Sequence, residues 1–364
     1  MVLAVVRETQ EVIFRTQRVW ERCTASAPYA TRLQQEANAL MEPPHEAEPL
    51  RVAFRHFYPN FSPQTFWLPI LRRVCETPVA LASAHQADLI FTSVFEDFWS
   101  IWHRRLFSRR TSPRVPEPAR RVLSSAKQIW ITGENVRAPL SGYDLTLSFD
   151  TDDYGETNLY FPYLLENLNW DTHQEHNSSQ LLNLRGAPKL SPIAAARPRV
   201  SSVSGRTGFV CAFVGNPEPV RMRAIDSLRK YGEVEVFGSA VGRPAAQKLA
   251  IAANFRFMLA FENDVYPGYV TEKPLEAYGC GAVPLWRGLD SAQILNPQAM
   301  INAMDYESLS DFAEQVAFVD SNPNKMDAMV QQPLLASIPS LEPLETALTK
   351  LASQALSGRR TVLP

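Results

Sequence analysis

The stretch FMLAFENDVYPGYVTEKPLEAYGCGAVPLWRG, residues 257–288, decides the fold of this chain. Residues 257–261 are apolar and predict a strand, and residues 262–268 predict a polar loop. Thr271 is a suitable N-cap for a helix that runs to a glycine-rich stop, and residues 282–286 predict a second strand. The stretch therefore predicts the strand-helix-strand unit of a parallel α/β protein.

The start of this helix has the properties of an anion-binding site. Its first amides have no partner within the helix, its dipole favours negative charge, and Lys273 adds a full positive charge. A nucleotide diphosphate is the natural ligand for such a site. A plain Rossmann unit would show the same alternation of strand and helix, but it would not need FEN followed by YVTEK.

Composition excludes several classes of function. The chain has 364 residues, of which 45% are hydrophobic and 20% charged, which is typical of a globular protein with room for two domains. Its net charge of -2 argues against a nucleic-acid partner. The sequence contains no apolar run of about 18 residues that would span a membrane. It shows no secretory signal and no CxxC pair among its 4 cysteines, so we expect a cytoplasmic protein with reduced thiols.

Hydrophobic patterns divide the chain into two α/β units. Outside the opening stretch, strands are predicted at residues 50–56, 87–92, 128–132, 145–149, 209–214 and 233–237. The division is a helical lead-in (1–47), an acceptor-binding α/β domain (48–170), a linker (171–207), a Rossmann-like domain (208–335) and a helical tail (336–364). The expected fold is α/β, with two Rossmann-like lobes that face a central cleft.

The opening stretch resembles the donor-binding motif of the α-1,3/4-fucosyltransferases of glycosyltransferase family 10, in their bacterial type. The family pattern is roughly FxLxFENSxxxxYxTEK, and it is matched by Phe261, Glu262, Asn263, Tyr269, Thr271, Glu272 and Lys273. Asp264 stands where the family has Ser, and Pro274 replaces an aliphatic residue. The resemblance implies a GT-B-type glycosyltransferase that uses GDP-fucose as donor substrate, and it implies donor contacts for the matching residues from Glu262 to Lys273.

Glu134 is the candidate general base. It follows a predicted strand, at the end where α/β sheets present ligand-binding loops, although a glutamate in such a place is more often a surface or capping residue. The continuation TGENVRAPLSGYDLTLSFD resembles the bacterial pattern TGENxxPxxxxxDxxxxFD. By that resemblance, Glu134 removes the proton of the acceptor hydroxyl.

Arg221 is the candidate diphosphate clamp, with Arg223 second. Both lie at the start of a helix that follows a strand, where a guanidinium can bind phosphate through paired hydrogen bonds, although a solvated helix arginine is common. The segment resembles the family pattern SNxxxxxR, with Gly215 in place of Ser and one residue fewer between Asn216 and Arg221. The following VEVFG resembles a family strand end and implies that Phe237 and Gly238 lie near the nucleotide.

The resemblance implies an inverting transfer without an obligatory metal ion. The acceptor hydroxyl attacks the fucose carbon opposite the phosphate, and Arg221, Lys273 and helix amides stabilise the GDP charge. The default acceptor is an oligosaccharide or glycoconjugate of the lactosamine type, fucosylated on the 3-OH of GlcNAc or Glc through an α-1,3 or α-1,4 linkage. The candidate residues for stacking on the acceptor sugar follow the first strand, and they are His56, Tyr58 and Trp67.

Residues 95–121 form a further notable segment. Aromatic side chains recur there at helical spacing, and seven arginines lie between residues 104 and 121. A basic amphipathic helix can lie on the inner face of a membrane or bind a partner, while core packing of its aromatic stripe is the commoner outcome.

The acidic run from Asp150 to Asp153 contains a DxD, which in many glycosyltransferases holds a metal ion. It lies outside the donor half, so we interpret these residues as loop or capping residues. His173 and His176 are interpreted as surface residues. No metal site is predicted.

Two alternatives remain at this level. The same scaffold could use another nucleotide sugar, because contacts to guanine and to fucose are not separable in one sequence. A non-catalytic binder of sugar nucleotides could retain the donor lobe, but it would be expected to lose Glu134, which is present.

Overall fold

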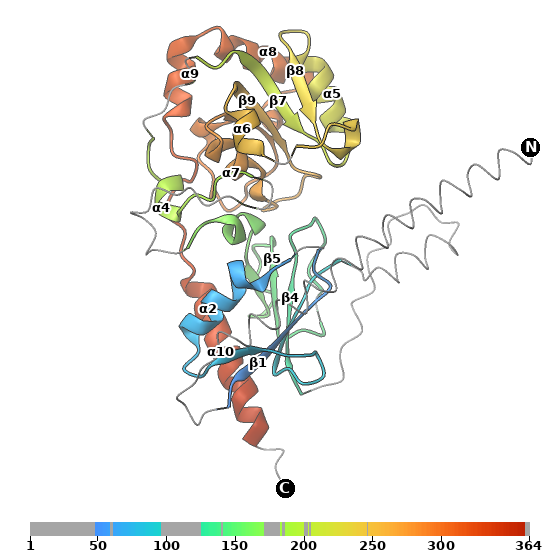
Figure 1. Cartoon of the computed structure of the whole chain (residues 1–364), viewed down its shortest axis with the longest axis vertical. Helices are drawn as coiled ribbons and strands as arrows, with labels where there is room; N and C mark the ends of the chain where they lie inside the picture. Colours follow the sequence, from blue (N-terminus) through green and yellow to red (C-terminus); the bar gives the residue numbers. More distant parts are fainter. Residues whose placement is uncertain are drawn as a thin grey trace, which may run out of the picture.

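The chain folds into two α/β lobes that lie one above the other along the long axis of the molecule (Figure 1). This computed structural model describes residues 48–58, 61–95, 125–139, 141–170, 183, 186–199, 203, 205–245 and 247–360. The predicted helical lead-in (1–47) and, apart from Phe95, the predicted amphipathic segment (95–121) lie outside the described residues, so both stay predictions.

The first lobe is built on a six-stranded parallel sheet in the order β2-β1-β3-β4-β5-β6. Its strands are β1 (Leu50–Arg55), β2 (Val79–Leu81), β3 (Leu89–Thr92), β4 (Lys127–Ile131), β5 (Leu145–Ser148) and β6 (Asn158–Tyr160). β3 and β5 are buried along their whole length, as expected for strands covered on both faces. The edge strands β2 and β6 were not predicted, because three residues are too few to show a period.

The C-terminal helix completes the core of the first lobe. α10 (Glu342–Arg360) runs beside α2 (Trp67–Val74), as Figure 1 shows. Its buried stripe consists of Leu344, Leu348, Leu351, Ala352 and Ala355. Residues 336–364 were predicted as a helical tail of their own, but the helix returns to the first sheet because its apolar stripe needs an apolar surface to cover it.

The second lobe is built on a five-stranded parallel sheet in the order β11-β10-β9-β7-β8. Its strands are β7 (Gly208–Phe213), β8 (Val234–Phe237), β9 (Phe255–Phe261), β10 (Val283–Arg287) and β11 (Ile301–Asn302). The strand-loop-helix-strand unit predicted from residues 257–288 is therefore present as β9, α7 (Glu272–Gly279) and β10. The expected α/β fold with two lobes on parallel sheets is confirmed.

Helices cover both faces of the second sheet. The covering helices are α5 (Pro219–Leu228), α6 (Lys248–Ala252), α7, α8 (Leu309–Asp320) and α9 (Pro323–Val330). Successive residues of a strand point to opposite faces, so Val210 packs with α5 and α8, while Cys211 packs with α6 and α7. The short helix α4 (Pro192–Ala195) lies in the connection between the lobes.

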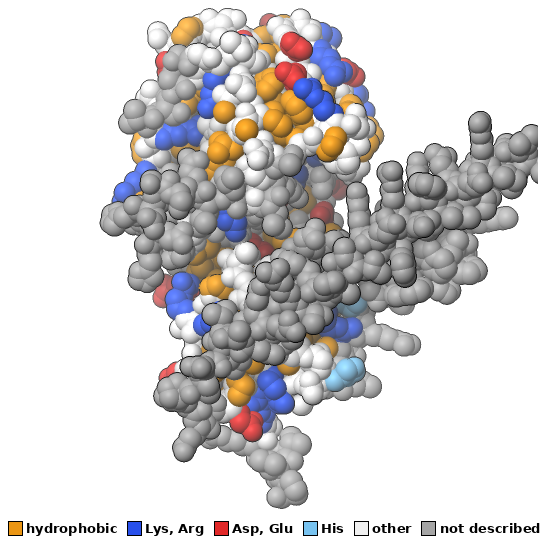
Figure 2. All heavy atoms as spheres, in the orientation of Figure 1, with side chains coloured by type: hydrophobic (Ala, Val, Ile, Leu, Met, Phe, Trp, Pro, Cys, Tyr) orange, Lys and Arg blue, Asp and Glu red, His pale blue; other side chains and the backbone are white. Residues whose placement is uncertain are grey.

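The part of the surface that the structure describes carries charges of both signs. Basic and acidic side chains are interspersed on the face shown in Figure 2, and the whole chain has a net charge of -2. Among the helices that the structure describes, none is both long enough and apolar enough to cross a lipid bilayer.

Candidate active site

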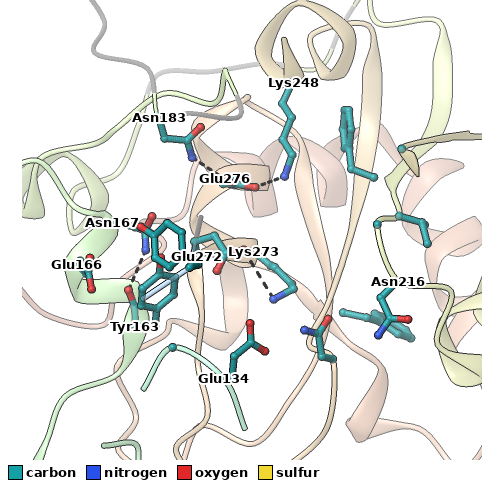
Figure 3. A pocket seen from close by; sticks show the side chains of 18 of the residues that line it. Glu134, Tyr163, Glu166, Asn167, Asn183, Asn216, Lys248, Glu272, Lys273 and Glu276 are labelled. Carbon is teal, nitrogen blue, oxygen red and sulfur yellow. Dashed lines mark hydrogen bonds and ion pairs between the residues drawn. The ribbon is translucent and has the colours of Figure 1, made fainter. Parts of the chain in front are cut away.

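A cavity of about 800 Å³ lies between the two lobes (Figure 3). Its lining residues follow the carboxyl ends of strands: Glu134 after β4, Gly215 after β7, Gly238 after β8 and Asn263 after β9. Open parallel sheets place their ligand-binding loops at this end. The volume is within the range of roughly 300–1,000 Å³ that is usual for small-molecule sites.

Glu134 reaches the cavity from a tight loop of the first lobe. Thr132, which is buried, accepts a hydrogen bond from the Glu134 amide (3.0 Å) and donates one to the Glu134 carbonyl (2.8 Å). A Cβ atom at Gly133 would lie 2.9 Å from the Tyr163 ring, so this position requires glycine unless Tyr163 moves. These constraints aim the Glu134 carboxylate across the cavity toward Glu272 and Lys273 (Figure 3).

Glu262 organises the start of α7 from behind the cavity wall. Its buried carboxylate accepts hydrogen bonds from the Thr271 amide (2.9 Å), the Thr271 hydroxyl (2.6 Å), the Lys273 ammonium (3.1 Å) and the Trp286 indole (3.3 Å). Thr271 is at the N-cap position as predicted, but its hydroxyl bonds Glu262 and makes no hydrogen bond to the helix amides. Glu262 and Thr271 therefore position the loop between β9 and α7, and neither lines the cavity.

Lys273 and Glu272 line the cavity from the first turn of α7. The Lys273 ammonium donates to the Thr271 hydroxyl at 2.8 Å and lies 3.8 Å from the Glu272 carboxylate. The Lys273 side chain keeps 21% of its surface exposed, whereas the Glu262 carboxylate that holds it is fully buried. Lys273 thus presents a positive charge beside the positive end of the α7 dipole.

Arg221 joins the loops that follow β7 and β9. Its guanidinium donates to the Asn216 carbonyl (2.6 Å), the Phe261 carbonyl (3.0 Å) and the Asn263 side-chain oxygen (3.1 Å). Burial lowers the pKa of this guanidinium, and the neighbouring Glu218 and Glu262 counteract the shift. Arg221 lines the cavity and holds both loops in place. It therefore presents a positive charge to the cavity from a fixed position.

Tyr269 supplies a buried polar atom that no other described residue hydrogen-bonds. Its hydroxyl is inaccessible, and the residue lines the cavity. Burial raises the pKa of this phenol, and the charges of Glu262 and Glu134 raise it further. The phenol therefore stays protonated. A buried hydroxyl of this kind usually has a partner, and a ligand oxygen in the cavity is a suitable one.

Gly238 and Phe237 form the wall that follows β8. Gly238 lines the cavity, with a backbone φ of 117° and ψ of 174° that side chains other than glycine rarely adopt. Phe237 stays buried behind it, stacked on Phe213 at a centroid distance of 5.5 Å and covered by the Arg243 guanidinium at 4.1 Å. Gly238 is thus part of the site, while Phe237 supports it.

Comparison with known proteins identifies the second lobe. Residues 203–330 match the family model for the C-terminal part of glycosyltransferase family 10, the fucosyltransferases. The second lobe is therefore similar to the C-terminal domain of that family.

Named relatives agree with this similarity. The α-(1,3)-fucosyltransferase FucT of Helicobacter pylori is 26% identical, over 59% of this chain and 49% of that protein. The human 4-galactosyl-N-acetylglucosaminide 3-α-L-fucosyltransferase 9 is 32% identical, over 36% of this chain and 38% of that protein. The chain thus spans half or less of the length of these curated relatives.

The fold extends the likeness to both lobes. A crystal structure of an α1,3-fucosyltransferase superposes with a TM-score of 0.63 at 20% sequence identity, covering 87% of this chain and 93% of the other. The chain therefore shares its two-lobed fold with that α1,3-fucosyltransferase.

Most residues predicted to bind the donor meet at the second lobe's side of the cavity. The lining includes Gly238, Arg221, Asn263, Tyr269, Glu272 and Lys273. Arg223 is not among them. It is two positions after Arg221 on α5, about 200° around the helix, and its charge instead affects Arg287.

The prediction that Trp67 contacts the acceptor was wrong. Its side chain is completely buried in the first lobe, with its ring centroid 4.9 Å from Phe66 and 5.1 Å from Phe91. Trp67 is the first residue of the amphipathic helix α2, and its side chain packs into the core, as large apolar side chains usually do. Tyr58 does line the cavity, whereas His56 lies outside its lining.

The acidic run that contains the DxD has structural partners. Asp150 is buried and accepts a hydrogen bond from Arg137 at 3.1 Å, and the Asp153 side chain accepts from the Gly155 amide at 3.0 Å. His173 and His176 lie outside the described residues. Within the described part of the chain, no three His, Cys, Asp or Glu side chains are arranged to hold a metal ion.

Sequence reasoning missed one polar cluster on each side of the cavity. Lys248 donates to Glu276, and the Asn183 amide donates to the same carboxylate at 2.7 Å (Figure 3). On the other side, burial raises the pKa of the Glu166 carboxyl to about 7, and the nearby Lys189 counteracts part of that shift. The paired residues are at least 23 positions apart in the sequence, so no local pattern predicts these pairs.

Replacing Gly238 with alanine is expected to destabilise the protein by about 2 kcal/mol, because the backbone conformation there is nearly exclusive to glycine. The added Cβ would also lie 2.2 Å from the Val214 carbonyl oxygen, so the loop after β7 must shift. Denaturant unfolding measures the loss, and GDP binding should weaken in parallel. Gly242→Ala is the matched control, because Gly242 has a φ of 65° but open space around it. Equal losses for both variants would contradict the role of the contact with Val214.

Proposed function

We propose that this chain is an inverting fucosyltransferase that moves L-fucose from GDP-fucose to a hydroxyl of an oligosaccharide or glycoconjugate. One observation carries the proposal: Glu134 of the first lobe lines the same cavity as Arg221 and Lys273 of the second. The family 10 match and the names of the relatives support it. So does a similarly folded α1,3-fucosyltransferase whose structure was determined with GDP-fucose.

The second lobe binds the donor. The diphosphate lies between Arg221 and Lys273, next to the N-terminus of α7, where the helix dipole and fixed positive groups oppose its charge. Glu272 accepts hydrogen bonds from sugar hydroxyls, and the protonated Tyr269 phenol donates to a donor oxygen. These groups are held by neighbouring residues before the donor arrives, so little reorganisation is needed.

The first lobe supplies the chemistry. Glu134 takes the proton of the acceptor hydroxyl as its oxygen attacks the anomeric carbon of fucose from the face opposite the phosphate. The bond between that carbon and the phosphate oxygen breaks, and GDP leaves with the electron pair. Arg221, Lys273 and the α7 amides stabilise the charge that develops on GDP. The configuration at the anomeric carbon inverts, which gives an α-linked product from a β-linked donor.

The acceptor enters along the first-lobe side of the cavity. Phe57, Tyr58 and Phe95 line that side and offer aromatic surfaces for stacking on sugar rings. The proposed acceptor is a lactosamine-type glycan, fucosylated on the 3-OH of GlcNAc or Glc through an α-1,3 or α-1,4 linkage.

A donor and acceptor screen tests this function. The purified chain is offered GDP-fucose, GDP-mannose and UDP-galactose, each with lactosamine-type glycans, and the product linkage is determined by NMR. Transfer is expected from GDP-fucose, with an α anomeric configuration, and it should persist in EDTA because Arg221 and Lys273 supply the positive charge. Transfer only from a UDP-sugar, or a β-linked product, would overturn the proposal.

A further inference from the structure

The loop that carries Glu134 is hydrogen-bonded directly to residues 262–270 of the other lobe, which we call the donor loop. The Asn135 amide donates a hydrogen bond to the Asp264 carboxylate at 2.8 Å. Asn135 is the residue after Glu134, and Asp264 is the residue after the cavity-lining Asn263. A single hydrogen bond therefore connects the neighbours of two groups that face the ligand from opposite lobes.

Further contacts join the same two segments. The Arg137 guanidinium lies over the Tyr266 ring at 4.3 Å, and Asp150 orients it through a hydrogen bond of 3.1 Å. The Phe149 ring meets the Tyr266 ring edge-on at 5.2 Å. Cation-aromatic and aromatic pairs of this kind are each worth roughly 0.5–1.5 kcal/mol. The donor loop thus rests on the first lobe along several residues.

The backbone of the donor loop approaches the first lobe closely at Gly268. The Tyr160 hydroxyl donates to the Gly268 carbonyl at 3.3 Å, and a Cβ atom at Gly268 would lie 2.3 Å from the Phe149 carbonyl oxygen. One residue after Tyr269, the Val270 carbonyl accepts from the Leu164 amide at 3.3 Å. Such close packing transmits small displacements from one loop to the other.

We propose that Asn135 and Asp264 form an interlobe latch that sets the position of Glu134 relative to the bound donor. This inference rests on the proposed function and adds two positioning residues to it. Neither residue lines the cavity, so both act through their neighbours. The bond between them holds the base-bearing loop against the donor loop, and a shift of about 1 Å between reacting groups is enough to slow a reaction up to about 100-fold.

Exchanging the amide and the carboxylate across the latch separates the effect of the hydrogen bond from the effect of the charge. Asn135→Asp places two carboxylates where the hydrogen bond was, so the loops repel each other. Asp264→Asn keeps a hydrogen bond, because an amide oxygen accepts from Asn135 as a carboxylate does, but it removes the charge that also acts on Arg287. The double variant Asn135→Asp/Asp264→Asn restores a bond with donor and acceptor exchanged.

The expected pattern is specific to a latch. Asn135→Asp should lower kcat about 10-fold or more, with GDP affinity within about twofold of the wild type. Asp264→Asn should stay near the wild type, and the double variant should recover most of the lost kcat. The aspartate at position 135 is still present in the double variant, so recovery does not come from removing its charge. The single variant Asp264→Asn measures the effect of losing the charge at position 264.

Hydrogen exchange provides a readout that does not need turnover. In the unliganded protein, Asn135→Asp should speed amide exchange in peptides covering residues 133–139 and 262–270, and the double variant should reverse the change. Unchanged kcat and exchange in Asn135→Asp, or a folded double variant without recovery, would overturn the latch. A wild type without fucose transfer would instead overturn the proposed function, and the exchange pattern would still decide whether the latch exists.

Discussion

Glu134→Gln is expected to lower kcat for fucose transfer about 1,000-fold, because loss of a general base typically costs a factor of 10²–10⁴. Glutamine keeps the size of the side chain and the loop contacts made by Thr132, but its amide does not take up the acceptor proton. GDP affinity should change by no more than about twofold, because Glu134 lies across the cavity from the proposed donor-binding residues. Initial-rate kinetics and calorimetric titration with GDP measure the two quantities.

A surface carboxylate provides the control for this variant. Glu156 has 85% of its side chain exposed and makes a long ion pair of 3.9 Å with Lys350. Glu156→Gln should therefore leave both kcat and GDP affinity unchanged. If Glu134→Gln transfers fucose at the wild-type rate, Glu134 is not the base.

Lys273→Met is expected to weaken GDP binding about 30-fold, because a hydrogen bond to a charged group is worth about 1.5–3 kcal/mol. Methionine keeps most of the side-chain volume but removes the charge beside the α7 N-terminus. Glu262 then loses one of its partners and retains Thr271 and Trp286, so the loop should stay folded. Calorimetry with GDP gives the loss in affinity, and thermal unfolding checks the fold.

Guanosine distinguishes phosphate binding from a general disturbance of the loop. It lacks the diphosphate, so its affinity should be nearly equal in the wild type and in Lys273→Met. The exposed Lys325 of α9 lies beside Phe318 of α8 and outside the cavity lining, so Lys325→Met serves as the lysine control. Equal losses for guanosine and GDP would mean that Lys273 only neutralises Glu262.

Local patterns allowed the prediction of the elements and of much of the site. The pattern of apolar and polar residues in Phe257–Gly288 changes period at each boundary between strand, loop, helix and strand. The structure forms β9, α7 and β10 from this segment, as the pattern predicts. Arg221, Lys273 and Glu134 each follow a strand end or begin a helix, which are positions that parallel sheets direct toward one edge. The resemblance to family motifs singled them out from other residues in such positions.

Other roles depended on burial, which no local pattern reports. Trp67 looked like a sugar-stacking residue, but its ring packs against Phe91 and Phe161 in the core of the first lobe. Glu262 shares a motif with cavity residues, yet its carboxylate points inward to Thr271 and Lys273. In both cases the side chain had two possible environments, and only packing chose between them.

The sequence by itself determined the two-lobed α/β fold, the donor motif of residues 257–288 and the identity of the candidate base. These features rest on short-range periodicity and on residue types at fixed spacing, which any segment carries with it. The tertiary structure alone decided that Glu134 faces Lys273 and that Asn135 bonds Asp264. Those residues are more than a hundred positions apart, so their meeting depends on how the two lobes pack rather than on either segment.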